Sequence, residues 1–190
     1  MRLRHLTTKF SEKPSSICGP PRSDKLPAIP PSMSLETTHE SEVPTIVLDT
    51  NAVLDGWLFK DLGMVDVLRA LDGRHMLWVA TVRMRNELVH TLELPVLQAW
   101  HTEAAHTVAR FDAMALLCSE PGRTVNRHLW CSDNDDQMFV DLALQRNACW
   151  LLTKDKALLK LGRRARPYGV QILHPARWRS TSGAPAPPRA

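Results

Sequence analysis

The sequence predicts an α/β protein in which helices cover both faces of a central, mainly parallel sheet. Short apolar runs of the kind that form buried strands alternate with segments of helical periodicity along the middle of the chain. The 190 residues are 44% hydrophobic and 23% charged, which excludes a fibrous, collagen-like or wholly disordered chain. We therefore expect one domain with its own hydrophobic core.

Proline marks where this domain begins and ends. Six of the 14 prolines lie within residues 1–32, and three more lie near the C-terminus. The N-terminal stretch shows no hydrophobic periodicity, so it buries too little apolar surface to offset the entropy of ordering. We expect residues 1–42 to be a disordered or dispensable extension, with Met33 as an alternative start and a targeting or RNA-tethering arm as the other interpretation. The folded domain then spans 43–179, and residues 180–190 form a disordered tail.

In the first half of the domain the expected order is strand, helix, strand, helix, helix. VPTIVLD (43–49) is a β-branched apolar run typical of a buried strand, and HMLWVA (75–80) is a second. Gly73 closes the helix between these strands. Thr81 can cap the helix that follows, and Pro95 suits the first turn of a long helix reaching about residue 118.

Along this last helix, apolar residues recur at three- and four-residue steps, at Leu97, Trp100, Ala104, Val108, Phe111, Ala115 and Cys118. Such a stripe is either buried in the same subunit or forms the contact surface of a homodimer.

The second half continues the alternation. We expect TVNRHLW (124–130) to be a strand, and DDQMFVDLALQRN (135–147) to be an amphipathic helix. CWLLT (149–153) is a short buried strand, DKALLKLGRRA (155–165) a helix, and VQILH (170–174) a last strand. In a parallel sheet of this kind, ligands bind at the carboxyl ends of the strands.

Other patterns exclude several classes of protein. No stretch approaches 18 apolar residues and the N-terminus has no apolar segment of a secretory signal, so we expect a cytoplasmic protein without a membrane span. The four cysteines form no CxxC pair, so neither a disulfide framework nor a structural zinc site is expected. The two histidines of HTEAAH (101–106) are five residues apart, whereas the zinc-binding motif HExxH needs a spacing of four. The six tryptophans are spread along the chain, which favours core packing over a base-stacking platform.

Charge is unevenly distributed. The net charge of +4 equals the balance of residues 1–32, whereas from Lys156 onward there are eight Lys or Arg and no acid. The stretch KLGRRARPYG (160–169) is either a solvated helix end or a rim that binds phosphates. For the second interpretation, the candidates for contact with an RNA backbone are Lys154, Lys160, Arg163, Arg164 and Arg166.

Acidic residues fall where predicted strands end or helices begin. Asp49 ends the first strand and Asp155 follows CWLLT, while Asp133, Asp135 and Asp136 precede a helix. Glu87, on the helix after the second strand, can point toward the same sheet edge. Converging carboxylates repel one another unless a cation neutralises them, and oxygen ligands suit Mg²⁺ or Mn²⁺. Such ions can activate a water and neutralise a phosphodiester under attack, which is nuclease chemistry.

Four segments together resemble the acidic motifs of PIN-domain ribonucleases: IVLDTN (46–51), the NEL around Glu87, CSDNDDQMFVDLA (131–143) and LLTKDKALL (151–159). The resemblance covers roughly residues 44–178 and is closest to the bacterial, VapC-like branch of toxins from toxin–antitoxin systems. It implies a three-layer α/β/α sandwich and a Mg²⁺- or Mn²⁺-dependent endoribonuclease whose nucleophile is water. A cognate antitoxin and an RNA substrate are the implied partners.

The resemblance also implies roles for residues. By position, Asp49, Glu87, Asp136 and Asp155 are the catalytic, metal-binding acids, with Asp133 as a further metal ligand. Asn51 and Thr153 match polar positions that orient ligands or water.

Each acid also has a structural interpretation as a helix cap or a solvated side chain. Two other functions compete with the nuclease. A haloacid-dehalogenase phosphatase needs a second Asp two residues after the first, where this chain has Asn51. A silent PIN fold that binds RNA or protein would be favoured had one of the four acids been lost.

Overall fold

The structure is a computed structural model that describes residues 43–179. The expected N-terminal extension (1–42), with its alternative start at Met33, and the expected tail (180–190) lie outside the described residues. No helix within the described range is both long and apolar enough to cross a membrane.

A five-stranded parallel sheet forms the centre of the described domain, in the order β3-β2-β1-β4-β5. Its strands are β1 (Thr45–Leu48), β2 (Leu77–Thr81), β3 (Leu116–Cys118), β4 (Trp150–Leu152) and β5 (Gln171–Leu173). The chain builds outward from β1 through β2 to β3 and then crosses to the other side of β1 to form β4 and β5. Strand order therefore reverses between the paired strands β1 and β4. Open α/β sheets bind ligands at the carboxyl ends of the strands at such a point.

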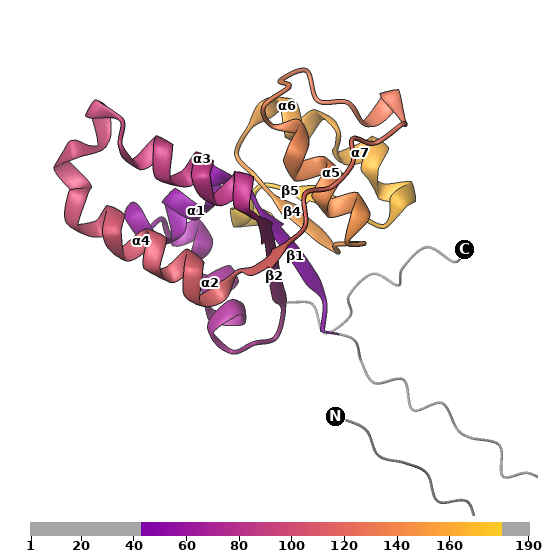
Figure 1. The fold of residues 1–190 in the computed structure, drawn as a ribbon. Coiled ribbons are helices and arrows are strands. Elements are labelled where there is room, and N and C mark those ends of the chain that lie inside the picture. The colour runs from indigo at the N-terminus through magenta and orange to yellow at the C-terminus, as the bar shows by residue number, and fades with distance from the viewer. Residues whose placement is uncertain (1–42, 180–190) are drawn as a thin grey trace, which may run out of the picture. The chain divides into compact units, whose positions relative to one another are not determined.

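Helices lie on both sides of the sheet, which confirms the α/β sandwich. In Figure 1, α1, α3 and α4 gather on one side of the strands and α5, α6 and α7 on the other. The helices are α1 (Thr50–Val53), α2 (Val65–Asp72), α3 (Val82–Leu92), α4 (His101–Met114), α5 (Gln137–Gln145), α6 (Lys156–Lys160) and α7 (Gly162–Ala165).

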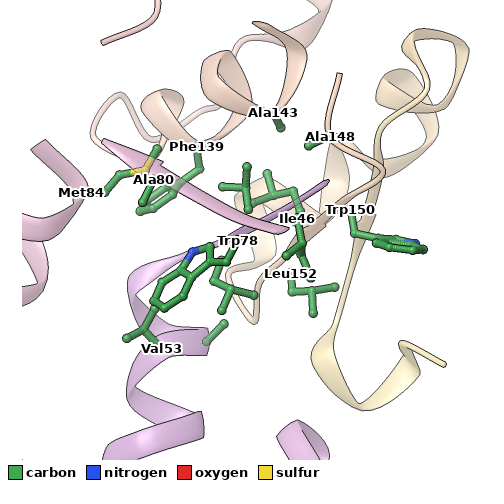
Figure 2. Close-up of a cluster of buried hydrophobic side chains, with 14 of the residues drawn as sticks. Ile46, Val53, Trp78, Ala80, Met84, Phe139, Ala143, Ala148, Trp150 and Leu152 are labelled. Carbon is green, nitrogen blue, oxygen red and sulfur yellow. The ribbon is translucent and has the colours of Figure 1, made fainter. Parts of the chain in front are cut away.

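The core sits against both faces of the sheet. Figure 2 shows Phe139 and Ala143 of α5 above the strands and Val53 of α1 below them in that view. Trp78 of β2 stacks on Trp57 with a centroid distance of 5.3 Å, and the edge of Phe111 of α4 meets the same ring at 4.8 Å. These buried aromatic side chains fix the sheet against its helices.

The predicted helix over 95–118 is wrong in its bounds. Pro95–Trp100 is a 3₁₀ turn, α4 ends at Met114, and Ala115 adopts an extended conformation that starts β3. The apolar stripe does not distinguish one continuous helix from a 3₁₀ turn, a helix and a strand in succession, because its three- and four-residue spacing continues through all three elements. Within it Leu97 and Phe111 are buried, whereas Trp100 is exposed and packs edge-on against Phe59. Ala104, Val108, Ala115 and Cys118 pack against the core while partly exposed.

Two other predictions need correction, and one element was not predicted. Residues 124–130 form no strand; they are a loop with a 3₁₀ turn at Arg127–Leu129, because the Asn126 side chain accepts a hydrogen bond from the N–H of His128. The helix predicted over 155–165 is two short helices, α6 and α7, separated at Leu161. The π-helix Leu54–Leu58, which continues α1 after β1, was not predicted from the sequence.

Candidate functional site

Asp49 is the innermost acid of the site. It follows β1 directly and is only 2% exposed. Its backbone N–H donates to the carbonyl of Leu152 at 3.1 Å, which ties it to the end of β4. Its Oδ1 accepts from the N–H of Ala52 at 2.6 Å and so caps α1, and its Oδ2 accepts from the hydroxyl of Thr153. The buried carboxylate therefore has a fixed orientation.

Thr153 links Asp49 to the next acid along the sheet edge. While its hydroxyl donates to Asp49, its Oγ1 accepts from the N–H of Asp155 at 2.8 Å. Asp155 caps α6, with Oδ1 accepting from the N–H groups of Ala157 at 2.5 Å and Leu158 at 3.1 Å. The supporting position proposed for Thr153 is thus a direct hydrogen-bond bridge between two of the predicted acids.

Glu87 enters the site from α3. Thr81, the last residue of β2, caps this helix by accepting from the N–H of Met84, as the sequence predicts. The half-buried Glu87 carboxylate accepts a hydrogen bond from the hydroxyl of Thr50 at 2.7 Å. Thr50 immediately follows Asp49, so this bond brings Glu87 to the carboxyl end of β1.

The remaining acids lie on the loop before α5. Asp136 is partly buried at the first turn of that helix, whereas Asp133 and Asp135 are exposed. The Oδ1 of Asp133 accepts from the N–H of Asp135 at 3.0 Å, which shapes the loop. The buried side chain of Gln137 also holds this loop by accepting from the N–H of Cys131 at 2.7 Å.

The pKa values show that these acids lie within electrostatic reach of one another. Burial raises the pKa of Asp49 to about 7, and the charges of Asp136 and Asp55 add to the increase. Burial also raises the pKa of Asp136 to about 6, with further increases from Asp155, Asp133, Glu87 and Asp135. The pKa of Glu87 is raised by burial and, to a lesser extent, by Asp135 and Asp133.

These acids have few positive neighbours in the described part of the chain, where the charge of Arg83 lowers the pKa of Glu87 but is outweighed by burial. Within residues 43–179, none of Asp49, Glu87, Asp133, Asp136 and Asp155 takes part in an ion pair. In the same range, no three Asp, Glu, His or Cys side chains converge tightly enough to form a ready-made coordination group. The donor set nevertheless fits a hard divalent cation, because every donor is a carboxylate oxygen. Burial and, to a lesser extent, the charges of neighbouring acids raise the pKa values of Asp49, Glu87 and Asp136, which a bound cation would offset.

A lysine beside the site is committed to other acids. The Nζ of Lys154 lies 2.6 Å from Oδ2 of Asp55 and 2.6 Å from Oδ2 of Asp61. Partial burial lowers the pKa of Lys154, but the hydrogen bonds to the two carboxylates outweigh this and raise it. Sequence reasoning missed Asp55 and Asp61, because nothing in their local pattern indicates a partner about 100 residues away.

The other predicted polar and basic residues are solvent-facing. Asn51 is exposed on α1, two residues after Asp49. Lys160, Arg163, Arg164 and Arg166 are exposed on or after α6 and α7, and the guanidinium of Arg164 donates to the carbonyl of His128 at 3.4 Å. These four side chains are accessible to a ligand, whereas Lys154 is largely neutralised.

Comparison with known proteins gives a match over the part of the chain that carries these residues. A family model described as PIN domain matches residues 45–157, which is more than half of the 190-residue chain. The match runs from the start of β1 into α6 and includes all of the acids described above. No curated protein matches the chain.

Proposed function

Because the chain belongs to the PIN domain family, we propose that it is a Mg²⁺- or Mn²⁺-dependent endoribonuclease that hydrolyses RNA phosphodiesters with water as the nucleophile. The observation that carries the proposal is the group of unneutralised carboxylates at the point where strand order reverses. These carboxylates come from four separate elements, at Asp49, Glu87, Asp136 and Asp155. Burial and the charges of neighbouring acids together raise the pKa values of three of them, Asp49, Glu87 and Asp136.

We assign these four acids, with Asp133 beside them, as the residues that would hold the metal. When bound, Mg²⁺ or Mn²⁺ lowers the pKa of a water and neutralises charge on a phosphodiester under attack. The protein's part is to present oxygens in fixed positions. Thr153, the N–H of Ala52 and the hydroxyl of Thr50 do this for Asp49 and Glu87. Asn51, exposed next to this edge, is assigned to orienting water or substrate.

The alternative is a catalytically silent PIN fold that binds RNA or protein. The structure gives a specific reason to favour the enzyme. Burying a carboxylate such as Asp49 among other acids is energetically unfavourable. A silent fold has no need for such a group, whereas a metal centre requires it as a ligand. The two functions are separated by whether metal-dependent cleavage occurs.

We further propose that the protein is the toxin of a type II toxin–antitoxin pair and acts in the cytoplasm. The support for this is the resemblance of its motifs to the bacterial VapC-like branch. A homodimer is part of the same proposal, and exposed apolar side chains near α4, such as Trp100, Val96 and Phe59, are compatible with it.

Cleavage of a mixed RNA pool tests the enzymatic proposal. The wild type should cut RNA with Mn²⁺ and not with EDTA, and Asp136→Asn should lower the rate by at least about 100-fold, because electrostatic stabilisation by such a group is of that order. Asp66→Asn is the matched control, since it removes an equal charge from an exposed position on α2. Equal cutting by all three proteins would refute the assignment.

A further inference from the structure

Two arginines are held on an exposed tryptophan in the loop that leads to the acidic residues. The Cζ atoms of Arg123 and Arg127 lie 4.3 and 5.3 Å from the centre of the Trp130 ring. Trp130 is 36% exposed, and its Nε1–H donates to the carbonyl of Thr124 at 2.9 Å. Trp130 is therefore not a core residue, in contrast to the role that the sequence pattern favours for the tryptophans.

Cation–π contacts position a guanidinium without using its hydrogen-bond donors. Among the described residues, neither Arg123 nor Arg127 forms an ion pair. Their N–H groups remain available to a ligand, and the planar fork of N–H donors matches the oxygens of a phosphate.

The loop that carries the two arginines is braced on its other side. Asn126 accepts from the N–H of His128 at 3.0 Å and also contacts the hydroxyl of Tyr168. Arg164 donates to the carbonyl of His128. Because these contacts fix the loop before any ligand arrives, less conformational entropy is lost on binding.

A polar cavity of about 160 Å³ lies between Arg123 and the segment that carries Asp133, Asp135 and Asp136. Arg123 lines it together with Arg83, one helical turn before Glu87, and Asn134, which lies between Asp133 and Asp135. Two carboxylates, Glu120 and Asp141, also line the cavity. Each already accepts a backbone N–H, from Arg83 at 3.0 Å and from Thr124 at 2.9 Å respectively.

We propose that Arg123 and Arg127, positioned by Trp130, bind backbone phosphates of single-stranded RNA beside the acidic centre. This rests on the proposed function for the identity of the substrate. The acids themselves repel a polyanion, so the strand needs cations next to them, and Arg123 shares the lining of this cavity with Asn134, which lies between Asp133 and Asp135. Arginine combined with an exposed aromatic residue is also the usual composition of single-strand binding surfaces.

RNA binding by Arg123→Ala/Arg127→Ala tests the inference without requiring cleavage. Affinity for a short unstructured RNA is measured by fluorescence anisotropy in EDTA over a series of KCl concentrations. Removing two phosphate contacts should weaken binding several-fold and reduce the slope of log K against log salt by about 1.4, since each contact with a single strand contributes about 0.7.

Arg74→Ala/Arg146→Ala is the matched control. Arg74 follows α2 and Arg146 follows α5, so both lie toward the edge where β2 and β4 begin, away from the acids. This variant loses the same charge and should keep the salt slope of the wild type. Equal slopes in the two double variants would overturn the inference, as would a wild type that binds no RNA.

The role of Trp130 as a positioning residue has its own measurement. Trp130→Phe keeps an aromatic face under the guanidinium groups and should retain most of the affinity, whereas Trp130→Ala should bind as weakly as the double arginine variant. Equal binding by the two Trp130 variants would contradict this role. RNA binding that depends on the arginines in a protein that cleaves nothing would refute the proposed function and leave this inference standing.

Discussion

At the scale of single residues, the central feature is a carboxylate that the fold buries although its neighbours repel it. Asp49 is placed by the end of β1, held by Thr153 and Ala52, and exposed to the charge of Asp136. A group in this position is either protonated or compensated by a cation. Its protonation is therefore linked to the stability of the metal-free protein.

This linkage predicts a pH dependence. In the unfolded chain the pKa of Asp49 is about 3.9, and in the folded metal-free chain it is about 7. The folded state holds the proton more tightly, so this contribution to stability is present below about pH 4 and is lost as pH rises toward 7. Asp49→Asn should unfold like the wild type at pH 4 and be more stable at pH 8, by up to about 4 kcal/mol.

Urea unfolding in EDTA at the two pH values measures this difference. Asp112→Asn serves as the control because Asp112 is exposed and paired with Arg85, which lowers its pKa. A wild type and an Asp49→Asn variant with parallel pH profiles would contradict the linkage.

At the scale of elements, the π-helix after α1 is held in place by the lysine that precedes Asp155. Asp55 is buried within the π-helix Leu54–Leu58. Its carboxylate forms an ion pair with Lys154, which lies just after β4. Insertions of this kind into a helix often occur beside functional sites. The pair thus connects the segment after Asp49 to the segment that carries Asp155.

Lys154→Met should leave the Asp55 carboxylate buried without a cation. We expect a loss of about 2 kcal/mol in the free energy of unfolding, which is less than for a fully buried pair because a third of the lysine side chain remains exposed. Lys156→Met, an exposed neighbour on α6, should change it little. Thermal and urea unfolding of the two variants provide the comparison, and equal stabilities would show that the ion pair does not hold the π-helix.

The strands and several helices of the domain could be predicted from sequence because each is encoded locally. The buried runs at β1, β2, β4 and β5 have no competing pattern, and Thr81 and Gly73 mark helix ends by their own chemistry. β3 could not be predicted, because it is a three-residue edge strand whose apolar residues continue the spacing of α4.

The candidate site shows the same division. The positions of Asp49 and Asp155 follow from where strands end, so the sequence alone places them at one sheet edge. The bond between Thr50 and Glu87 and the pairing of Lys154 with Asp55 depend on tertiary contacts between distant segments. Trp130 was misassigned to the core, because composition does not reveal that its loop leaves the ring exposed.

At the scale of the whole molecule, metal binding should stabilise the fold. A cation that binds only the folded chain adds stability of about 2.7 kcal/mol at a concentration one hundred times its Kd. Mn²⁺ should therefore raise the Tm of the wild type and reverse the loss of stability at high pH. Asp136→Asn should show a smaller shift, and scanning calorimetry with and without Mn²⁺ measures both. An unchanged wild-type Tm at saturating Mn²⁺ would count against a metal centre.

The central claim, that the acidic residues form the centre of a metal-dependent ribonuclease, is tested most directly by the products of RNA cleavage in oxygen-18 water. If water is the nucleophile, Mn²⁺-dependent cleavage places one oxygen-18 atom in the terminal phosphate of the product. Mass spectrometry should find this label and no 2′,3′-cyclic phosphate in the products of the wild type. Asp136→Asn should yield little or no labelled product. Unlabelled or cyclic ends, or cleavage that persists in EDTA, would contradict the account.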